Sequence, residues 1–147
     1  KWAKGLAWHT RSDGNAVPFD MQEESDGTRK LFEFIGGWIT ALNIGATLCV
    51  DEIDRSLHPH LTRMLVQLFR GDTNCNNGQL IFTTHDTTLL DPELLRRDQI
   101  WFAEKNEARS TIIYPLLDYS PRKKENLERG YLLGRYGAIP FVGDLRL

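Results

Sequence analysis

The stretch that decides the fold is residues 46–58, ATLCVDEIDRSLH. Its opening run, ATLCV, is short, largely apolar and followed at once by Asp51 and Glu52. Such a run is typical of a strand that is buried on both faces of a parallel sheet, because a central strand needs apolar side chains on its two sides. A second run of this kind, residues 79–84, ends at His85. We therefore expect two parallel strands with polar residues at their carboxyl ends.

Helical patterns surround these strands. In residues 31–42 apolar side chains recur at the spacing of one helix face. Pro59 is suited to open a second helix, since its fixed φ and missing N–H cost least in the first turn, and the loop 71–78 ends that helix. A short helix is expected at 92–97 and a third strand at 99–104. This alternation predicts an α/β layered sheet with right-handed crossovers, in which ligands bind at the carboxyl ends of the strands.

The remainder of the chain is expected to form smaller elements. Residues 106–110 are typical of a hairpin turn that leads into an alternating strand at 111–116, and a charged helix is expected at 121–133. The predicted organisation is a lead-in segment, a first helix with the turn before it, a central sheet portion, and a C-terminal hairpin with a helix, at residues 1–22, 23–45, 46–104 and 105–147.

Composition narrows the class of protein. With 147 residues, 41% hydrophobic and 26% charged, the chain has the size and make-up of one soluble globular domain. The formal net charge of −2 lacks the basic bias of a dedicated nucleic-acid-binding module. No apolar run approaches the roughly 18 residues of a membrane helix, and no charged n-region with an apolar h-region opens these residues, so we expect neither a membrane span nor a signal peptide. Cys49 and Cys75 show no CxxC spacing, so a reducing, cytoplasmic location is expected.

Asp51 and Glu52 carry the first candidate chemistry. A nucleotide hydrolase uses an apolar strand that ends in two carboxylates, one to hold Mg²⁺ or its water and the next to polarise the attacking water. Asp51 would take the metal role and Glu52 the catalytic role. The alternative is an ordinary acidic pair at the end of a strand.

His85 directly follows the neighbouring predicted strand. Adjacent parallel strands would bring its imidazole near Glu52, where it could donate a hydrogen bond to a γ-phosphate or orient water. A lone histidine at a strand end is usually structural, yet chance seldom supplies such residues at two neighbouring strand ends. We therefore interpret His85 as a second candidate catalytic residue.

The segment Glu24-Ser25-Asp26-Gly27-Thr28 precedes the first predicted helix. Free N–H groups at a helix start, the helix dipole and the Ser25 hydroxyl can together bind an anion, and Gly27 lets a phosphate approach the backbone. The alternative is that Ser25 or Asp26 is simply the N-cap of the helix. The segment alone does not decide between the two.

In order and spacing these motifs resemble the C-terminal half of an ABC-type, SMC-like ATPase head domain, which has a P-loop NTPase fold. The resemblance covers residues 23–104. It implies that the signature motif, the Walker B strand, the D-loop and the switch histidine correspond to residues 24–28, 47–52, 55–58 and His85. Residues 96–102 and 134–141 further resemble a bacterial subgroup of AAA-annotated ATPases associated with anti-phage defence.

The resemblance implies an ATPase that uses ATP and Mg²⁺. In this family the Walker residues of one protomer and the signature of another enclose each nucleotide, so a homodimer with two composite sites is implied. Asp51 would hold the metal, Glu52 and His85 would be catalytic, and the signature residues would act in trans. The residues that would bind the nucleotide are Ser25, Gly27, Thr28, Ser56 and His58.

Three features depart from the family pattern. Asp26 stands where the signature commonly has glycine, which brings a carboxylate near the phosphate-binding turn, and His58 stands where the D-loop commonly has aspartate. GxxxxGK[ST] occurs nowhere in the sequence, so the Walker A half is absent from these residues. We expect that loop to lie N-terminal to Lys1, and we expect the chain by itself to be inactive.

The implied function is ATP binding and hydrolysis by a head that dimerises around ATP and couples its nucleotide state to a nuclease or toxin effector in anti-phage defence. Two alternatives stay open, an SMC- or repair-type head that acts directly on DNA and a nucleotide-sensing scaffold with slow hydrolysis. Basic clusters at 96–97 and 122–124 leave nucleic-acid contact open, although short charge clusters are usually solvated. No membrane partner is expected.

Two weaker patterns could indicate functional sites but also have ordinary structural explanations. His58 and His60, with Asp54 upstream, would suit a divalent transition metal, but no further ligand cluster follows them. Tyr131, Tyr136 and Phe141 lie among Gly134 and Gly137 and could dock a partner, although aromatic residues near a C-terminus more often complete a core. We favour packing for these three aromatic residues.

Overall fold

The protein divides into two units, Lys1–His85 and Asp86–Leu147. The computed structural model describes residues 5–122 and 125–139, so parts of the segments 121–133 and 134–141 lie outside the described residues. Within the described ranges no helix is both long and apolar enough to cross a lipid bilayer. The candidate site lies in the first unit.

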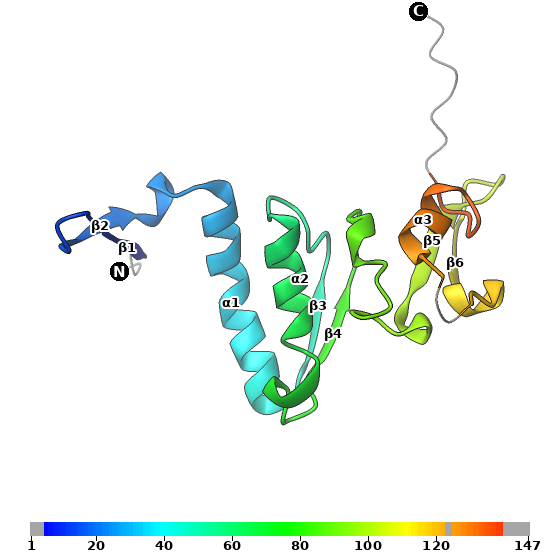
Figure 1. Ribbon diagram of the computed structural model, residues 1–147, viewed down its shortest axis with the longest axis horizontal. Helices are drawn as coiled ribbons and strands as arrows, with labels where there is room; N and C mark the ends of the chain where they lie inside the picture. The colour runs from blue at the N-terminus through cyan, green and yellow to red at the C-terminus, as the bar shows by residue number, and fades with distance from the viewer. Residues whose placement is uncertain (1–4, 123–124, 140–147) are drawn as a thin grey trace, which may run out of the picture. The chain divides into compact units, whose positions relative to one another are not determined.

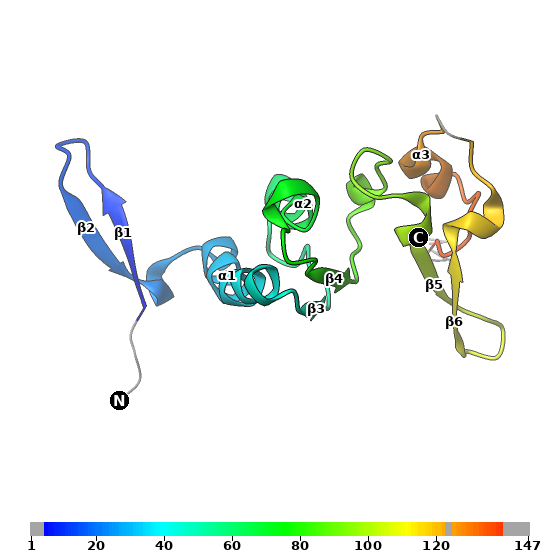
Figure 2. The ribbon, with the colours of Figure 1, turned by 90° about the horizontal axis from the view of Figure 1, so that it is seen from below.

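The centre of the first unit is a pair of parallel strands, β3 (Thr47–Val50) and β4 (Gln79–Phe82). The helix α2 (Pro59–Gln67) lies between them in the chain, and α1 (Asp26–Ile44) precedes β3. Both helices lie beside this sheet in Figures 1 and 2. The strands pair from their first residues to their last, so they end at the same edge. The two helices and two strands predicted for this part of the chain are confirmed.

One face of this sheet is covered and the other is exposed. The helix α1 packs on the side of Leu48, where a Cβ added at Gly37 would lie 3.4 Å from Leu48 Cδ1. Cys49 and Ile81 are exposed, Ile81 by 59%. The prediction that the strand is buried on both faces is therefore wrong for the described residues. A short apolar run indicates a strand but does not fix how many layers cover it.

Trp38 fixes the two helices to each other. Its side chain is 2% exposed, and its Nε1 donates a 3.0 Å hydrogen bond to the carbonyl oxygen of Leu65. Leu65 lies in the last turn of α2, where carbonyl groups lack partners within the helix, so the indole satisfies one of them. Phe34 and Phe69 pack against the indole, with ring centroids 5.2 and 6.1 Å from it.

A hairpin precedes α1 in the segment that we expected only as a lead-in. The strand β1 (Leu6–Thr10) pairs antiparallel with β2 (Ala16–Asp20). A short 3₁₀ helix, η1 (Met21–Glu23), follows the hairpin and leads toward α1. The turn contains Asp13 and Gly14, a dipeptide that favours hairpins, and this was the available sequence signal.

The second unit contains an antiparallel pair, β5 (Trp101–Lys105) and β6 (Thr111–Pro115). The predicted hairpin turn between them is confirmed, since the N–H of Asn106 donates to the carbonyl oxygen of Ser110 at 2.9 Å. The expectation that the third strand extends the parallel sheet is wrong, because β5 pairs with β6 instead. Partners that are close in sequence cost little loop-closure entropy, which favours the hairpin.

Two predicted helices of this unit are corrected. Residues 92–95 form only a turn, and the 3₁₀ helix η4 (Arg97–Gln99) follows. The helix expected at 121–133 is confined to α3 (Leu127–Leu132). The Asn126 side chain accepts a backbone N–H and caps the helix there, so the helix begins later than its charge pattern suggested.

Tyr136 completes the core of the second unit, as expected for packing rather than docking. It is 3% exposed and its hydroxyl donates to Glu125 Oε1 at 3.1 Å. Burial and this carboxylate raise the pKa of Tyr136, whereas the Arg122 backbone N–H and the Arg135 guanidinium lower the pKa of Glu125. The buried cluster around Tyr136 consists of Ile100, Phe102, Leu116 and Leu127.

The Trp38 contact generates a stability prediction. Trp38→Phe removes the donor to Leu65 and part of a buried ring, so the free energy of unfolding should fall by about 1–3 kcal/mol. Trp101→Phe is the control, because Trp101 is 59% exposed and should change stability by less than about 0.5 kcal/mol. Urea denaturation followed by circular dichroism measures both. Equal losses in the two variants would contradict the role given to Trp38.

Candidate functional site

The candidate site is centred on Thr83, the residue that follows β4. Its Oγ1 donates to Asp51 Oδ1 at 2.5 Å and accepts the N–H of Glu52 at 2.8 Å. The backbone pairing continues past the strands as well, since the N–H of Thr83 donates to Val50 and the N–H of Ile53 donates to Thr83, both at 3.0 Å. Thr83, which directly follows β4, therefore holds both of the acidic residues that follow β3, Asp51 and Glu52.

Glu52 occupies an unusual backbone conformation. Its φ is 49°, in the left-handed region that residues with a side chain seldom adopt, and Ser56 has a φ of 63°. The carboxylate of Glu52 lies 3.6 Å from Arg55 Nη1; the Arg55 side chain is largely exposed and the Glu52 side chain is partly exposed. An exposed pair of this kind contributes about 0–1 kcal/mol, so the carboxylate can exchange Arg55 for another partner at little cost.

His85 is tied to the loop after β3 through Asp54. Asp54 Oδ1 accepts the hydroxyl of Thr84 at 2.7 Å and the backbone N–H of His85 at 3.2 Å. The side chain of His85 is exposed. The structure thus brings the strand ends that carry Glu52 and His85 to one edge, where His85 is held by its backbone.

Thr83, Thr84 and Asp54 were not recognised from the sequence as part of this site. Asp54 had been considered only as a metal ligand. The available signal was the register: parallel strands that end together place the polar residues after β4 opposite those after β3.

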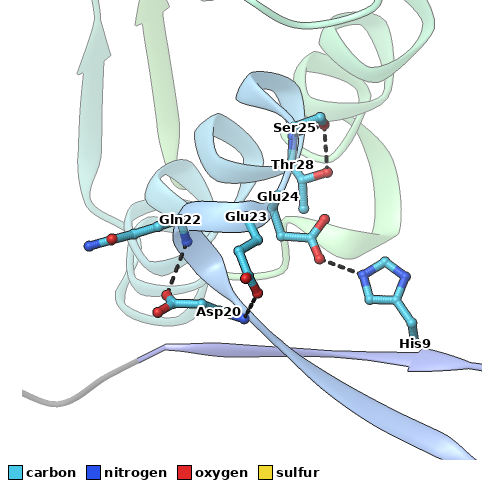
Figure 3. Close-up of polar contacts among 7 residues, drawn as sticks. All are labelled: His9, Asp20, Gln22, Glu23, Glu24, Ser25 and Thr28. Atoms are coloured by element: carbon cyan, nitrogen blue, oxygen red, sulfur yellow. Dashed lines mark hydrogen bonds and ion pairs between the residues drawn. The ribbon is translucent and has the colours of Figure 1, made fainter.

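Ser25 is the N-cap of α1. Its Oγ accepts the N–H of Thr28 at 3.2 Å and lies 2.9 Å from Thr28 Oγ1, as Figure 3 shows. The N-cap alternative therefore holds for Ser25 in this structure. Its hydroxyl still lies at the start of a helix of 19 residues, where free N–H groups and the dipole favour an anion.

The carboxylate of Asp26, the first departure from the family pattern, has a partner in the same helix turn. Asp26 Oδ1 pairs with the guanidinium of Arg29. This pairing offsets part of the negative charge that Asp26 brings to the predicted phosphate-binding turn.

Gly27 brings the predicted signature segment against the predicted D-loop. A Cβ added to Gly27 would lie 3.0 Å from the carbonyl oxygen of Ser56. This approach is tighter than most Cβ contacts, so a side chain here would push the Ser56 backbone away by a few tenths of an ångström. Two segments that are far apart in the sequence are therefore packed together in the first unit.

The hairpin is linked to the residue that precedes Ser25. The imidazole Nε2 of His9 pairs with Glu24 Oε1, and the Glu24 side chain is 10% exposed (Figure 3). Asp20 and Glu23 form a capping box around η1, so the chain between hairpin and α1 is held at several points. The sequence had given no sign of this support.

His58 is the N-cap of α2, with Pro59 at the helix start as predicted. Its Nδ1 accepts the N–H of His60 at 3.2 Å, so the imidazole performs the capping that an aspartate would perform. The two imidazoles stack with centroids 5.1 Å apart. Within the described residues no group of three or more metal-ligating side chains is found, which leaves the transition-metal alternative without support.

The residues after β3 and β4 fit a magnesium ion by their chemistry. Asp51 offers a carboxylate and Thr83 a hydroxyl, and Mg²⁺ prefers such oxygen ligands. Asp51 is exposed, so an ion and its waters can reach it. When bound, the ion would supply positive charge to a phosphate group.

The first unit is an α/β arrangement in which two parallel strands are followed, at one edge, by Asp51, Glu52 and His85. A family model described as "AAA domain, putative AbiEii toxin, Type IV TA system" matches residues 5–91. This match covers more than half of the chain, and the chain therefore belongs to that AAA domain family. Membership supports a P-loop NTPase fold and, in general, nucleotide binding and hydrolysis with ATP and Mg²⁺. Comparison with curated proteins gives no match, and neither does comparison with solved structures.

The contact at Gly27 generates the second prediction. Gly27→Ala places a methyl group against the Ser56 backbone, so it should lower the free energy of unfolding by about 1 kcal/mol. Gly36→Ala is the matched control in the same helix, because no atom lies within 4 Å of its added Cβ. The control should raise stability by about 0.5–1 kcal/mol, since alanine favours helix interiors. Thermal melting of both variants tests this, and equal stabilisation would show that the D-loop does not pack on α1.

Proposed function

We propose that this chain is the Walker B and signature half of an ABC-type ATPase head, which binds and hydrolyses ATP. The observation that carries the proposal is the Thr83 hydroxyl, which holds Asp51 and the Glu52 backbone together at one edge of the sheet. In parallel sheets this carboxyl edge is where ligands bind. Membership of the AAA domain family supports nucleotide as the ligand.

The proposed roles follow from the chemistry of each side chain. Asp51 holds Mg²⁺, directly or through water. Glu52 accepts a proton from the water that attacks the γ-phosphorus, while the bond from that phosphorus to the bridging β-phosphate oxygen breaks and ADP leaves. His85 donates a hydrogen bond to the γ-phosphate or orients the water. The partly exposed, weakly paired carboxylate of Glu52 is compatible with proton acceptance.

The rest of the site must come from outside these residues. Because GxxxxGK[ST] does not occur in the sequence, we assign the phosphate-binding loop and its lysine to polypeptide beyond residues 1–147. In the proposed homodimer, Ser25, Gly27 and Thr28 of one protomer approach the nucleotide of the other, with Ser56 and His58 beside them. The packing of Gly27 on Ser56 supports a concerted movement of these two segments.

The biological role that we propose is anti-phage defence, in which the nucleotide state of the head controls a nuclease or toxin effector. The description of the family names a toxin and a type IV toxin–antitoxin system, which supports such a role.

The central test replaces the two strand-end carboxylates separately in the native-length protein. Glu52→Gln should abolish ATP turnover and keep ATP binding, because the amide is nearly isosteric and only the proton acceptor is lost. Asp51→Asn should instead weaken binding of Mg·ATP itself. Phosphate release measures turnover and calorimetry measures binding. Glu107→Gln, an exposed glutamate of the second unit, is the control and should behave as wild type. Turnover at the wild-type rate in Glu52→Gln would refute the proposed function.

A separate prediction concerns His85. His85→Ala should lower turnover on the order of 10²-fold with little change in melting temperature. The reason is that the structural bond to Asp54 uses the backbone N–H, which alanine retains, whereas the exposed imidazole is lost. Glu107→Ala, at an exposed residue of the second unit, serves as the control. A destabilised His85→Ala protein with normal activity per folded molecule would instead assign the imidazole a structural role.

A further inference from the structure

The loop after β3 is bound to the chain after β4 at four consecutive positions. Thr83 contacts the Asp51 side chain and the N–H groups of Glu52 and Ile53, as described above. The fourth contact, made by Asp54, lies furthest along the loop and reaches His85. Ile53, between the acidic residues, is fully buried, with 0% of its surface exposed.

Asp54 bonds to the chain after β4 through its side-chain oxygen Oδ1. Oδ1 accepts the Thr84 hydroxyl at 2.7 Å and the His85 backbone N–H at 3.2 Å, while the N–H of Leu57 donates to the Asp54 carbonyl at 3.1 Å. The side chain is half-buried. Hydrogen bonds to a charged carboxylate are stronger than those between neutral groups, so this oxygen restricts where the His85 backbone can lie.

We infer that Asp54 is a positioning residue for ATP hydrolysis, which sets the position of His85 relative to Glu52. This inference rests on the proposed function. Asp54 lies two residues after Glu52 and bonds to the backbone of His85, so it joins the loops that carry the proposed base and the proposed γ-phosphate contact. Loss of the Oδ1 acceptor frees the segment after β4, and the imidazole no longer meets the γ-phosphate in the geometry that Glu52 requires.

The inference predicts different effects for losing the hydrogen-bond acceptor of Asp54 and for losing its negative charge. Asparagine keeps an oxygen at the position of Oδ1 and removes the negative charge, whereas alanine removes both. Asp54→Ala should lower kcat by about 10-fold or more and leave KM within about 2-fold, because the alignment of the reacting groups is lost and not the binding of ATP. Asp54→Asn should restore kcat to within about 3-fold of wild type.

Substitutions of Thr84, which donates a hydrogen bond to Asp54, provide a second test. Thr84→Val removes the hydroxyl that shares Oδ1, and Thr84→Ser keeps it. Thr84→Val should lower kcat less than Asp54→Ala, and the double variant should lose less than the product of the two single losses, since both act on one network. Asp13→Ala is the matched control in the same unit. Asp13 Oδ1 also accepts a backbone N–H, that of Asn15 at 2.9 Å, but it lies in the hairpin turn.

The experiment measures steady-state ATP hydrolysis by these variants in the native-length protein, together with the exchange rate of the His85 backbone amide by NMR. We expect faster amide exchange and lower kcat in Asp54→Ala, and near wild-type values of both in Asp54→Asn and Asp13→Ala. Three results would overturn the role of Asp54: normal kcat per folded molecule in Asp54→Ala, equal impairment in Asp54→Asn, or unchanged exchange at His85. Wild-type turnover in Glu52→Gln would instead overturn the proposed function, and the amide exchange would still report whether Asp54 holds His85.

Discussion

The hydroxyl of Thr83 is the contact on which the candidate site depends. A threonine hydroxyl can donate one hydrogen bond and accept others, and here it donates to Asp51 and accepts from the backbone of Glu52. The first bond orients a carboxylate, and the second fixes the chain where it leaves the strand. Neither bond could form if the two strands ended at opposite edges. Parallel pairing of β3 and β4 is therefore a precondition of the chemistry as well as of the fold.

The two helices bring a second set of residues to the same unit. Trp38 bonds to the last turn of α2, so α1 cannot slide along α2 without leaving a buried carbonyl unsatisfied. At the start of α1, Gly27 lies so close to Ser56 that an added side chain would have to displace the Ser56 backbone slightly. One helix is thus fixed by a large residue near its middle and by a residue without a side chain at its start. A shift of α1 in the proposed dimer would accordingly also move the predicted D-loop, residues 55–58.

The sequence predicted the strands and helices around the site well. It predicted poorly which layers cover them and which distant residues bond to each other. The strands β3 and β4 and the helix that starts at Pro59 follow from local pattern, because apolar runs and a proline at a helix start act on their own neighbourhood. Exposure of Ile81 could not be predicted, since it depends on which layers cover the sheet. The bond from Thr84 to Asp54 joins residues 30 positions apart, and hydrogen bonds of that kind leave no periodic trace in a sequence. The roles of the candidate site residues in hydrolysis stay predictions.

The loop that carries the proposed base stores backbone strain that the surrounding contacts balance. Left-handed conformations at Glu52 and Ser56 cost on the order of 1–3 kcal/mol each. The bonds from Thr83, Thr84 and the His85 backbone contribute about 1 kcal/mol apiece, which is comparable in sum. A loop balanced in this way persists only while its partners are in place. The conformation of Glu52 is therefore a property of both strand ends together, and any ligand that displaces the chain after β4 also changes where the Glu52 carboxylate lies.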